Sequence, residues 1–141
     1  MHKITNIIAQ IHRLDYQYRA SKFEPFGLKA CHGKYLKVIC DNPGICQEEM
    51  TAYMCVNKSN IARQVAVLEE AGYIERKTCS KDRRVIRLYP TEKTRALEGE
   101  ILQVMETWQQ HVLQDLSEED LMMLETLLDK IRQRALEEGD D

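Results

Sequence analysis

The chain has 141 residues, of which 43% are hydrophobic and 30% are charged, a composition typical of one compact soluble domain. No apolar run approaches the roughly 18 residues of a membrane-spanning helix, and polar residues interrupt the apolar ones at the N-terminus, which excludes a signal-peptide core. The five cysteines form no CxxC pair, which disfavours a disulfide framework or a zinc knuckle. We therefore expect a cytoplasmic protein with reduced thiols and no membrane partner.

Helical periodicity dominates the first half of the chain. From Ile4 to Tyr18, apolar residues recur every three or four positions, which predicts an amphipathic helix ending before Glu24, because Pro25 disfavours helix at the preceding residue. A second helix is expected over about 29–40, before a cluster of turn residues at 41–44. A short helix over about 47–54, a break at 55–56, and a helix capped by Asn57 and ending at Gly72 should follow.

The period of the pattern changes after Gly72. Residues 73–79 and 84–90 are rich in β-branched and aromatic residues and flank a polar turn, so they predict a β-hairpin. A long helix over about 91–113 and a last helix capped by Ser117 complete the chain. The expected order is α-α-α-α-β-β-α-α, a mainly α fold with a small β-hairpin.

Charge is distributed unevenly along the chain. Residues 57–95 contain ten Lys and Arg against five Asp and Glu, whereas residues 96–141 contain three against thirteen. The order helix, tight turn, helix, hairpin is that of a winged helix-turn-helix, in which the second helix enters the DNA major groove and the hairpin is the wing. Because the basic segment includes both of these elements, we expect it to bind double-stranded DNA.

Particular side chains are expected to contact the DNA. With Ile61, Val65 and Leu68 turned inward, the second helix should present polar residues that can pair with base edges or phosphates: Lys58, Ser59, Asn60, Arg63 and Gln64. The hairpin tip carries three cations that can reach the minor groove: Lys81, Arg83 and Arg84. Asp82 would weaken phosphate binding if it pointed at DNA, so we expect it to support the tip by pairing with Arg84 or bonding turn amides. An alternative is a winged helix whose basic wing docks an acidic protein partner.

The segment "GICQEEMTAYMCVNKSNIARQVAVLEEAGYIERKTCSKDRRVIRLYPTEK" resembles the winged helix core of the MarR family of bacterial transcriptional regulators, and the likeness extends through the first helix and "LSEEDL". Asp82-Arg83-Arg84 is similar to the Asp-x-Arg of the family's wing. The resemblance implies one MarR-like domain over 1–141, in which 28–95 bind DNA while 1–27 and 96–141 form an intertwined homodimer. It also implies a repressor that is released from its operator by a ligand or an oxidant. A two-fold axis would make that operator pseudo-palindromic.

The sequence departs from the family pattern at three positions. Cys46 stands where a capping Thr or Ser is common, Cys55 where a turn Gly is usual, and Thr94 where Gly is frequent. A thiol is a poor helix cap, and a side chain at the turn requires either a negative φ or some strain. We expect these departures to affect local geometry rather than DNA contacts.

The release signal has two candidate sites. His12, Tyr16 and His32 are nominated from helix faces as polar liners of a cleft for a small aromatic or anionic effector, although each also suits a dimer interface. Cys79 lies near Lys77 and Lys81, whose charge would lower a thiol pKa, but it also suits a half-buried strand position. The four histidines show no metal-ligand spacing and no catalytic motif is present, so we expect no metal, no cofactor and no enzyme activity.

Overall fold

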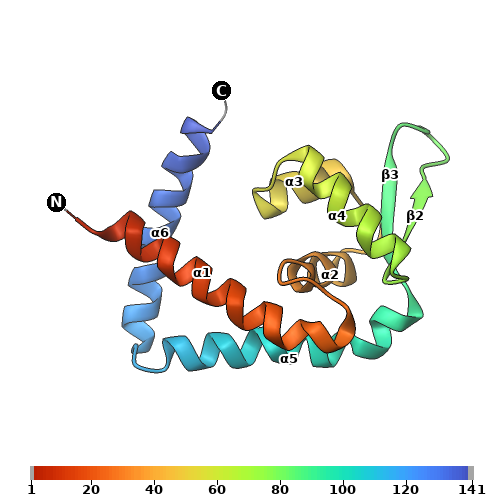
Figure 1. Ribbon diagram of the computed structural model, residues 1–141. Helices are drawn as coiled ribbons and strands as arrows, with labels where there is room; N and C mark the ends of the chain where they lie inside the picture. The colour runs from red at the N-terminus through yellow and green to blue at the C-terminus, as the bar shows by residue number, and fades with distance from the viewer. Residues whose placement is uncertain (1, 140–141) are drawn as a thin grey trace. The chain divides into compact units, whose positions relative to one another are not determined.

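The computed structural model describes residues 2–139 and is mainly α-helical with one small sheet, as expected (Figure 1). The elements are α1 (Ile4–Phe23), η1 (Glu24–Phe26), α2 (His32–Asp41), β1 (Ile45–Cys46), α3 (Gln47–Met54), α4 (Lys58–Glu70), β2 (Ile74–Thr78), β3 (Ile86–Pro90), α5 (Glu92–Leu113) and α6 (Glu118–Glu138). The chain divides into two compact units, Met1–Glu106 and Thr107–Asp141. The first unit therefore holds the whole winged helix together with α1 and most of α5. Within the described residues, no helix has the length and apolar character needed to cross a membrane.

The sheet contains the predicted hairpin and one further strand. Strand β2 pairs with β3 in antiparallel register from Ile74 opposite Pro90 to Thr78 opposite Ile86, which confirms the hairpin. The short strand β1 pairs with the other edge of β3, with Ile45 opposite Leu88, to give the order β1-β3-β2. Strand β1 was not predicted, because two residues are too few to show an alternating pattern.

Helix ends follow the capping residues closely. Oδ1 of Asn57 accepts the backbone N–H of Asn60 at 2.8 Å, and Gly72 follows the end of α4 with φ of +82°. Both are the roles predicted for them. Helix α2 begins at His32 rather than near Lys29, because the preceding residues form a turn in which the N–H of His32 donates to the Lys29 carbonyl.

The three unusual residues are accommodated in different ways. Cys55 adopts the left-handed conformation, with φ of 55°, so strain of order 1 kcal/mol is tolerated in the turn between α3 and α4. At Cys46 the carboxylate of Glu49 accepts the backbone N–H at 3.2 Å, which provides one half of a capping box. Thr94 is buried, and its hydroxyl donates to the carbonyl of Tyr73, which ties the start of α5 to the residue before β2.

The core lies beneath α4. Its three inward residues, Ile61, Val65 and Leu68, belong to one buried cluster with residues of α2 and the sheet: Leu36, Ile39, Ile74 and Leu88. Phe23 of α1 and Ile101 of α5 extend this cluster. At Gly33 of α2 an added Cβ would lie 2.6 Å from ring atoms of Phe23, so α1 and α2 approach too closely there for any side chain.

Two helices carry apolar side chains that nothing in their own unit covers. On α1 the exposed fractions are 37–56% for the stripe residues Ile4, Ile7, Ile8, Ile11 and Leu14. On α6 the exposed apolar residues are Met122, Met123, Leu124, Leu127, Leu128, Ile131 and Leu136. Contiguous apolar faces of this kind are typical of surfaces that bind another chain.

We predict that Leu68→Ala lowers the free energy of unfolding by about 2–5 kcal/mol, because it leaves a cavity where the side chain is 0% exposed. Urea titration followed by circular dichroism measures the change. Arg63→Ala, at an exposed position of the same helix, is the matched control and should cost less than about 0.5 kcal/mol. A loss below about 1 kcal/mol for Leu68→Ala would contradict its place in the core.

Candidate nucleic-acid interface

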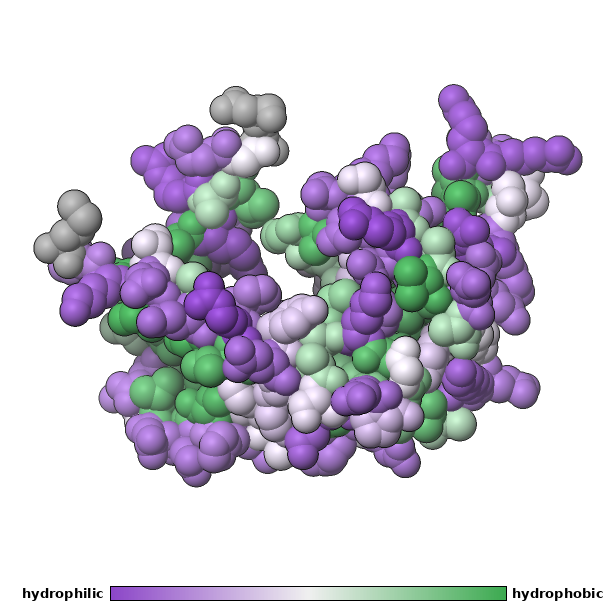
Figure 2. Space-filling model, viewed as in Figure 1, coloured by the Kyte–Doolittle hydropathy of each residue, from purple (hydrophilic) through white to green (hydrophobic). Residues whose placement is uncertain are grey.

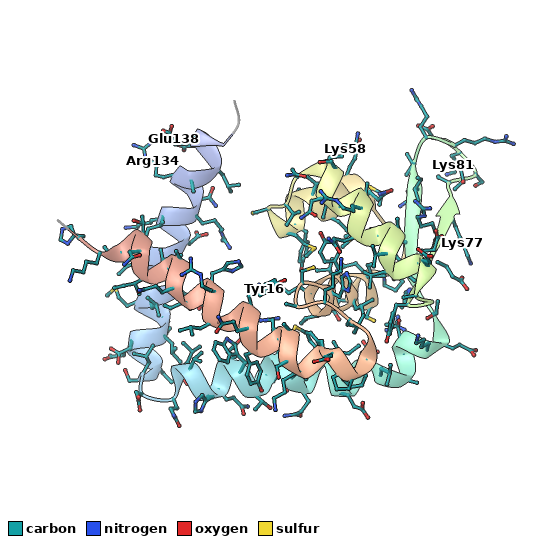
Figure 3. The ribbon with its side chains drawn as sticks, viewed as in Figure 1. Tyr16, Lys58, Lys77, Lys81, Arg134 and Glu138 are labelled. Atoms are coloured by element: carbon teal, nitrogen blue, oxygen red, sulfur yellow. The ribbon has the colours of Figure 1, made fainter. Side chains whose placement is uncertain are left out.

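The wing tip is a cluster of exposed cations held in shape by one carboxylate. Lys81, Arg83 and Arg84 are all exposed, and hydrophilic side chains project from the tip of the wing (Figures 2 and 3). Oδ1 of Asp82 accepts the backbone N–H of Arg84 at 3.0 Å and its Nε–H at 3.1 Å, and these bonds lower the pKa of the Asp82 carboxyl. The pairing expected for Asp82 is therefore present. The side chain of Arg84 is still 91% exposed, so it can contact a further anion.

The outward face of α4 is narrower than the sequence suggested. Lys58, Ser59 and Arg63 are exposed, as expected, and Lys58 makes only a distant contact of 3.9 Å with Glu48 (Figure 3). Ala62 and Ala66 are exposed on the same face. They were missed because alanine offers no hydrogen bond, although their spacing from Ile61 and Val65 already places them outward. Their methyl groups can contact thymine methyls in a major groove.

Asn60 and Gln64 do not lie on this outward face, and the expectation for them was wrong in that respect. Both are half-buried. Asn60 lines a cavity that also contains His12 and Tyr16, and the amide oxygen of Gln64 lies 2.8 Å from Nε2 of His32. The cause is their position next to Ile61 and Val65, on the flank of the helix that faces α2. Whether either side chain contacts DNA stays a prediction.

A groove of about 470 Å³ runs between the start of α4 and the wing. Its lining residues come from the starts of α3 and α4 and from the wing: Cys46, Gln47, Glu48, Lys58, Ala62, Asp82, Arg84, Val85 and Ile86. Lys58 on one wall and Arg84 on the other provide positive charge across the groove. A groove with these two cations can hold a phosphate backbone.

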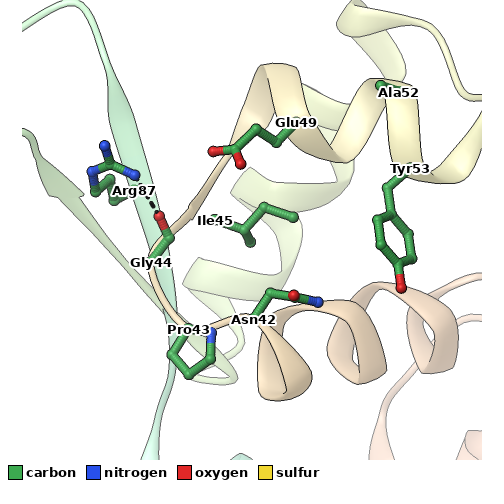
Figure 4. Close-up of a pocket in the computed structure, with 8 residues that line it drawn as sticks. All are labelled: Asn42, Pro43, Gly44, Ile45, Glu49, Ala52, Tyr53 and Arg87. Carbon is green, nitrogen blue, oxygen red and sulfur yellow. Dashed lines mark hydrogen bonds between the residues drawn. The ribbon is translucent and has the colours of Figure 1, made fainter.

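Arg87 is a basic residue of the wing that is engaged within the protein. Its Nη1–H donates to the Gly44 carbonyl at 2.9 Å, across a hollow at the connection between α2 and α3 (Figure 4). The Cys79 thiol raises the pKa of Arg87 further by hydrogen bonding and charge. Arg87 therefore fastens β3 to the helix-turn-helix and contributes less than the tip residues to a free cationic surface.

Cys79 occupies a half-buried position at the end of β2. Its pKa is lowered, first by the backbone N–H groups of Lys81 and Asp82 and then by the Arg87 side chain. The neighbours predicted from sequence were Lys77 and Lys81, so the direction of the shift was right and its cause was wrong. Folding of the turn brings backbone donors and Arg87 to the sulfur, and sequence spacing gives little sign of this.

A cavity of about 230 Å³ lies between α1, α2 and the turn before α4. His12 and Tyr16 line it, as nominated, together with Asp15, Arg19, Ala30, Cys31, Lys34, Tyr35, Met54, Val56 and Asn60 (Tyr16 in Figure 3). Two buried polar atoms of these residues have no hydrogen-bond partner: Nη1 of Arg19 and the hydroxyl of Tyr35. Burial raises the pKa of Tyr35 to about 12, so its hydroxyl is a donor at neutral pH.

His32 does not line this cavity, so its nomination as a liner was wrong. It is 1% exposed, and its ring is held by Lys29 and Gln64. Arg19 and Tyr35 were missed because a helical pattern shows which face a residue occupies but does not show whether its polar atoms find partners. The fold and these surfaces together define a winged helix protein of the nucleic-acid-binding class.

Comparison with known proteins supports the resemblance to the MarR family. The model of the MarR family matches residues 32–86, from the start of α2 to the start of β3. The chain is 29% identical to the transcriptional regulator SlyA, covering 97% of this chain and 96% of that one, with a TM-score of 0.92. It is 26% identical to a putative MarR family transcriptional regulator from Listeria monocytogenes, solved in complex with 26mer DNA, covering 98% and 92% with a TM-score of 0.92.

A MarR transcriptional regulator from Methanosarcina mazei Go1 is 25% identical, with coverage of 95% and 96% and a TM-score of 0.83. These matches agree with the resemblance drawn from the sequence: residues 32–86 match the MarR family, and the fold is that of solved MarR and SlyA transcriptional regulators, which are not enzymes.

Proposed function

We propose that the protein is a cytoplasmic repressor that binds a pseudo-palindromic operator as a homodimer and is released by a small aromatic or anionic effector or by thiol oxidation. The observation that carries the DNA-binding part is the groove in which Lys58 and Ala62 of α4 face Arg84 of the wing. The structural match bound to 26mer DNA supports the same use of the fold.

In this proposal α4, the wing tip and the groove between them each contact a different part of the DNA. The exposed face of α4, with Ser59, Ala62, Arg63 and Ala66, enters the major groove, where Arg63 can pair with guanine. The wing tip places Lys81, Arg83 and Arg84 at the adjacent minor groove, where the potential is most negative. The groove between the two elements holds the intervening phosphates.

The homodimer is supported by the uncovered apolar faces of α1 and α6. A chain that leaves at least ten large apolar side chains on these two helices in water gains free energy by burying them against a second copy. A two-fold axis would then place two α4 helices in successive major grooves about 34 Å apart. Half-sites one helical turn apart follow from this spacing.

Release by an effector is supported by the cavity beside α4. The free Nη1 of Arg19 and the hydroxyl of Tyr35 both donate hydrogen bonds, and Met54, Val56 and Ala30 provide an apolar wall. An anionic group on an apolar body fits this combination. Because Asn60 belongs to α4, the helix proposed to read the DNA, and lines the same cavity, a bound effector would contact that helix directly.

Release by oxidation is supported by the lowered pKa of Cys79 at the base of the wing tip. A thiolate reacts with peroxide far faster than a thiol, and the product is a sulfenic acid. Oxidation would also replace the thiolate that accepts from the Lys81 and Asp82 backbone, and would therefore alter the segment that carries the wing cations.

The first test is selection of bound duplexes from a random DNA pool by the purified protein at near-physiological salt. We expect the selected duplexes to share a pseudo-palindrome.

Binding of variants to the selected duplex tests the two DNA-contacting elements. Arg84→Ala should weaken binding to all duplexes and reduce the slope of log K against log salt concentration by about 1. Arg63→Ala should relax discrimination at one base pair by about 1–3 kcal/mol. Arg134→Ala, in the acidic α6, is the matched control. An unenriched pool would favour the docking of an acidic protein partner instead.

The dimer is tested by sedimentation equilibrium at micromolar concentration. We expect the mass of two chains for the wild type and a shift toward one chain for Ile11→Asp, because a carboxylate would be buried in the apolar contact. Asn6→Asp adds the same charge to the opposite side of α1 and should leave the mass unchanged. A wild-type protein with the mass of one chain would exclude the dimer.

The two release mechanisms are separated by operator binding measured with and without peroxide. If Cys79 is the sensor, peroxide should lower the affinity at least tenfold in the wild type, dithiothreitol should restore it, and Cys79→Ser should resist. Equal losses in both proteins would remove Cys79 as the sensor. An aromatic carboxylate that lowers operator affinity in the wild type but not in Tyr35→Phe would assign release to the cavity.

A further inference from the structure

A buried histidine joins α2 to the recognition helix. His32 is the first residue of α2, and its Nε2 lies 2.8 Å from Oε1 of Gln64 in α4. The ring is 1% exposed and the glutamine is half-buried. Among the described residues, this is the side-chain hydrogen bond that ties a potential DNA-contacting residue of α4 to the protein interior.

The protonation state of His32 follows from its second partner. Nδ1 of the ring lies 3.0 Å from the backbone nitrogen of Lys29, and a backbone N–H can only donate. Nδ1 is therefore the acceptor, so the neutral ring carries its proton on Nε2 and donates it to Gln64. Burial lowers the pKa of His32, which keeps the ring neutral at physiological pH.

This assignment determines how the Gln64 amide is turned. Its oxygen accepts from His32, so its NH2 group is directed away from the ring and keeps both N–H donors for another partner. A glutamine that selects adenine uses both ends of the amide: its oxygen accepts from the N6 amino group while its nitrogen donates to N7. The oxygen has a second lone pair, but it lies 2.8 Å from a ring that is only 1% exposed and therefore faces the protein interior, which leaves the NH2 group for a partner outside. N7 is present on adenine and guanine alike.

We propose that His32 is a positioning residue that limits Gln64 to a donor contact with purine N7 in the major groove, so that this base pair is recognised as a purine and not specifically as adenine. The proposal rests on the proposed function, since it requires sequence-specific DNA binding. It assigns to His32 a role in specificity although the side chain is too deeply buried to touch DNA.

The experiment uses the full-length protein and the selected operator with single base analogues, measured by fluorescence anisotropy at constant salt. The pair contacted by Gln64 is the one at which Gln64→Met, which is similar in size and lacks the amide, changes affinity. At that pair, 7-deazapurine removes the N7 acceptor and should weaken the wild-type complex about fivefold or more. 2′-Deoxynebularine is adenine's analogue without the 6-amino group. Placed at this pair, it should change the affinity no more than it does at a neighbouring control pair.

His32→Phe tests the positioning itself, because phenylalanine fills the site and removes the bond to the glutamine oxygen. We expect this variant to become sensitive to the 6-amino group at the same pair, while other pairs and the salt slope keep their wild-type values. Thermal unfolding confirms that the variant is folded. If it is not, the wild-type and Gln64→Met responses to the two analogues still decide the case.

Several results would overturn the proposal. One is a wild-type complex that loses as much affinity without the 6-amino group as without N7. Another is a Gln64→Met protein whose affinities for all operator variants equal those of the wild type. A third is a uniform loss of affinity over all duplexes in Gln64→Met, which would indicate a phosphate contact. A folded His32→Phe protein with the wild-type profile would also overturn it. Failure of the proposed function is distinct, because then the wild type itself enriches no sequence.

Discussion

Three side chains of α4, Ile61, Val65 and Leu68, are wholly removed from water, and their burial determines the rotation of this helix about its own axis. The composition of the surface that we propose to face DNA depends on that rotation. It turns Arg63 and the two alanines outward and turns Asn60 and Gln64 toward α2. A rotation of one residue, about 100°, would turn a neighbouring set of side chains into the core, either Asn60, Gln64 and Val67 or Ala62, Ala66 and Glu69. Burying the polar groups among them without partners would cost several kcal/mol, roughly 2–7 for each amide.

Two carboxylates lie among the cations of the groove between α4 and the wing. Asp82 bonds the backbone and side chain of Arg84, and Glu48 stands across the groove from Arg84 and near Lys58. Such exposed pairs contribute little to stability, since water and salt screen them. Their effect is on the shape of the surface and on its average charge. In the proposed complex with DNA, these carboxylates would reduce the non-specific attraction to phosphates, and more of the affinity would depend on the geometry of the contact.

The fold could be predicted from the sequence because its signals are local. Asn57 caps α4, Gly72 ends it, and the change from a helical to an alternating pattern marks the hairpin. The two-residue strand β1 carried too little pattern to be detected. At the candidate site the sequence showed which residues are charged but not which are already engaged. His32, nominated for an effector cleft, bonds Gln64 instead, and the free donors of Arg19 and Tyr35 emerge only from packing.

The close approach of α1 and α2 at Gly33 has a mechanical consequence. Ring atoms of Phe23 lie 2.6 Å from the position that a Cβ of Gly33 would take, so the Phe23 side chain packs directly on the backbone of α2. A close-packed contact of this kind transmits displacement instead of absorbing it. Gly33 is the neighbour of His32 in the chain, and His32 holds Gln64. A rotation of α1, which carries one of the uncovered apolar stripes, would therefore be passed to α4 through Phe23, Gly33 and His32. In the proposed dimer, the way in which α1 packs against a second copy would then affect base recognition by α4.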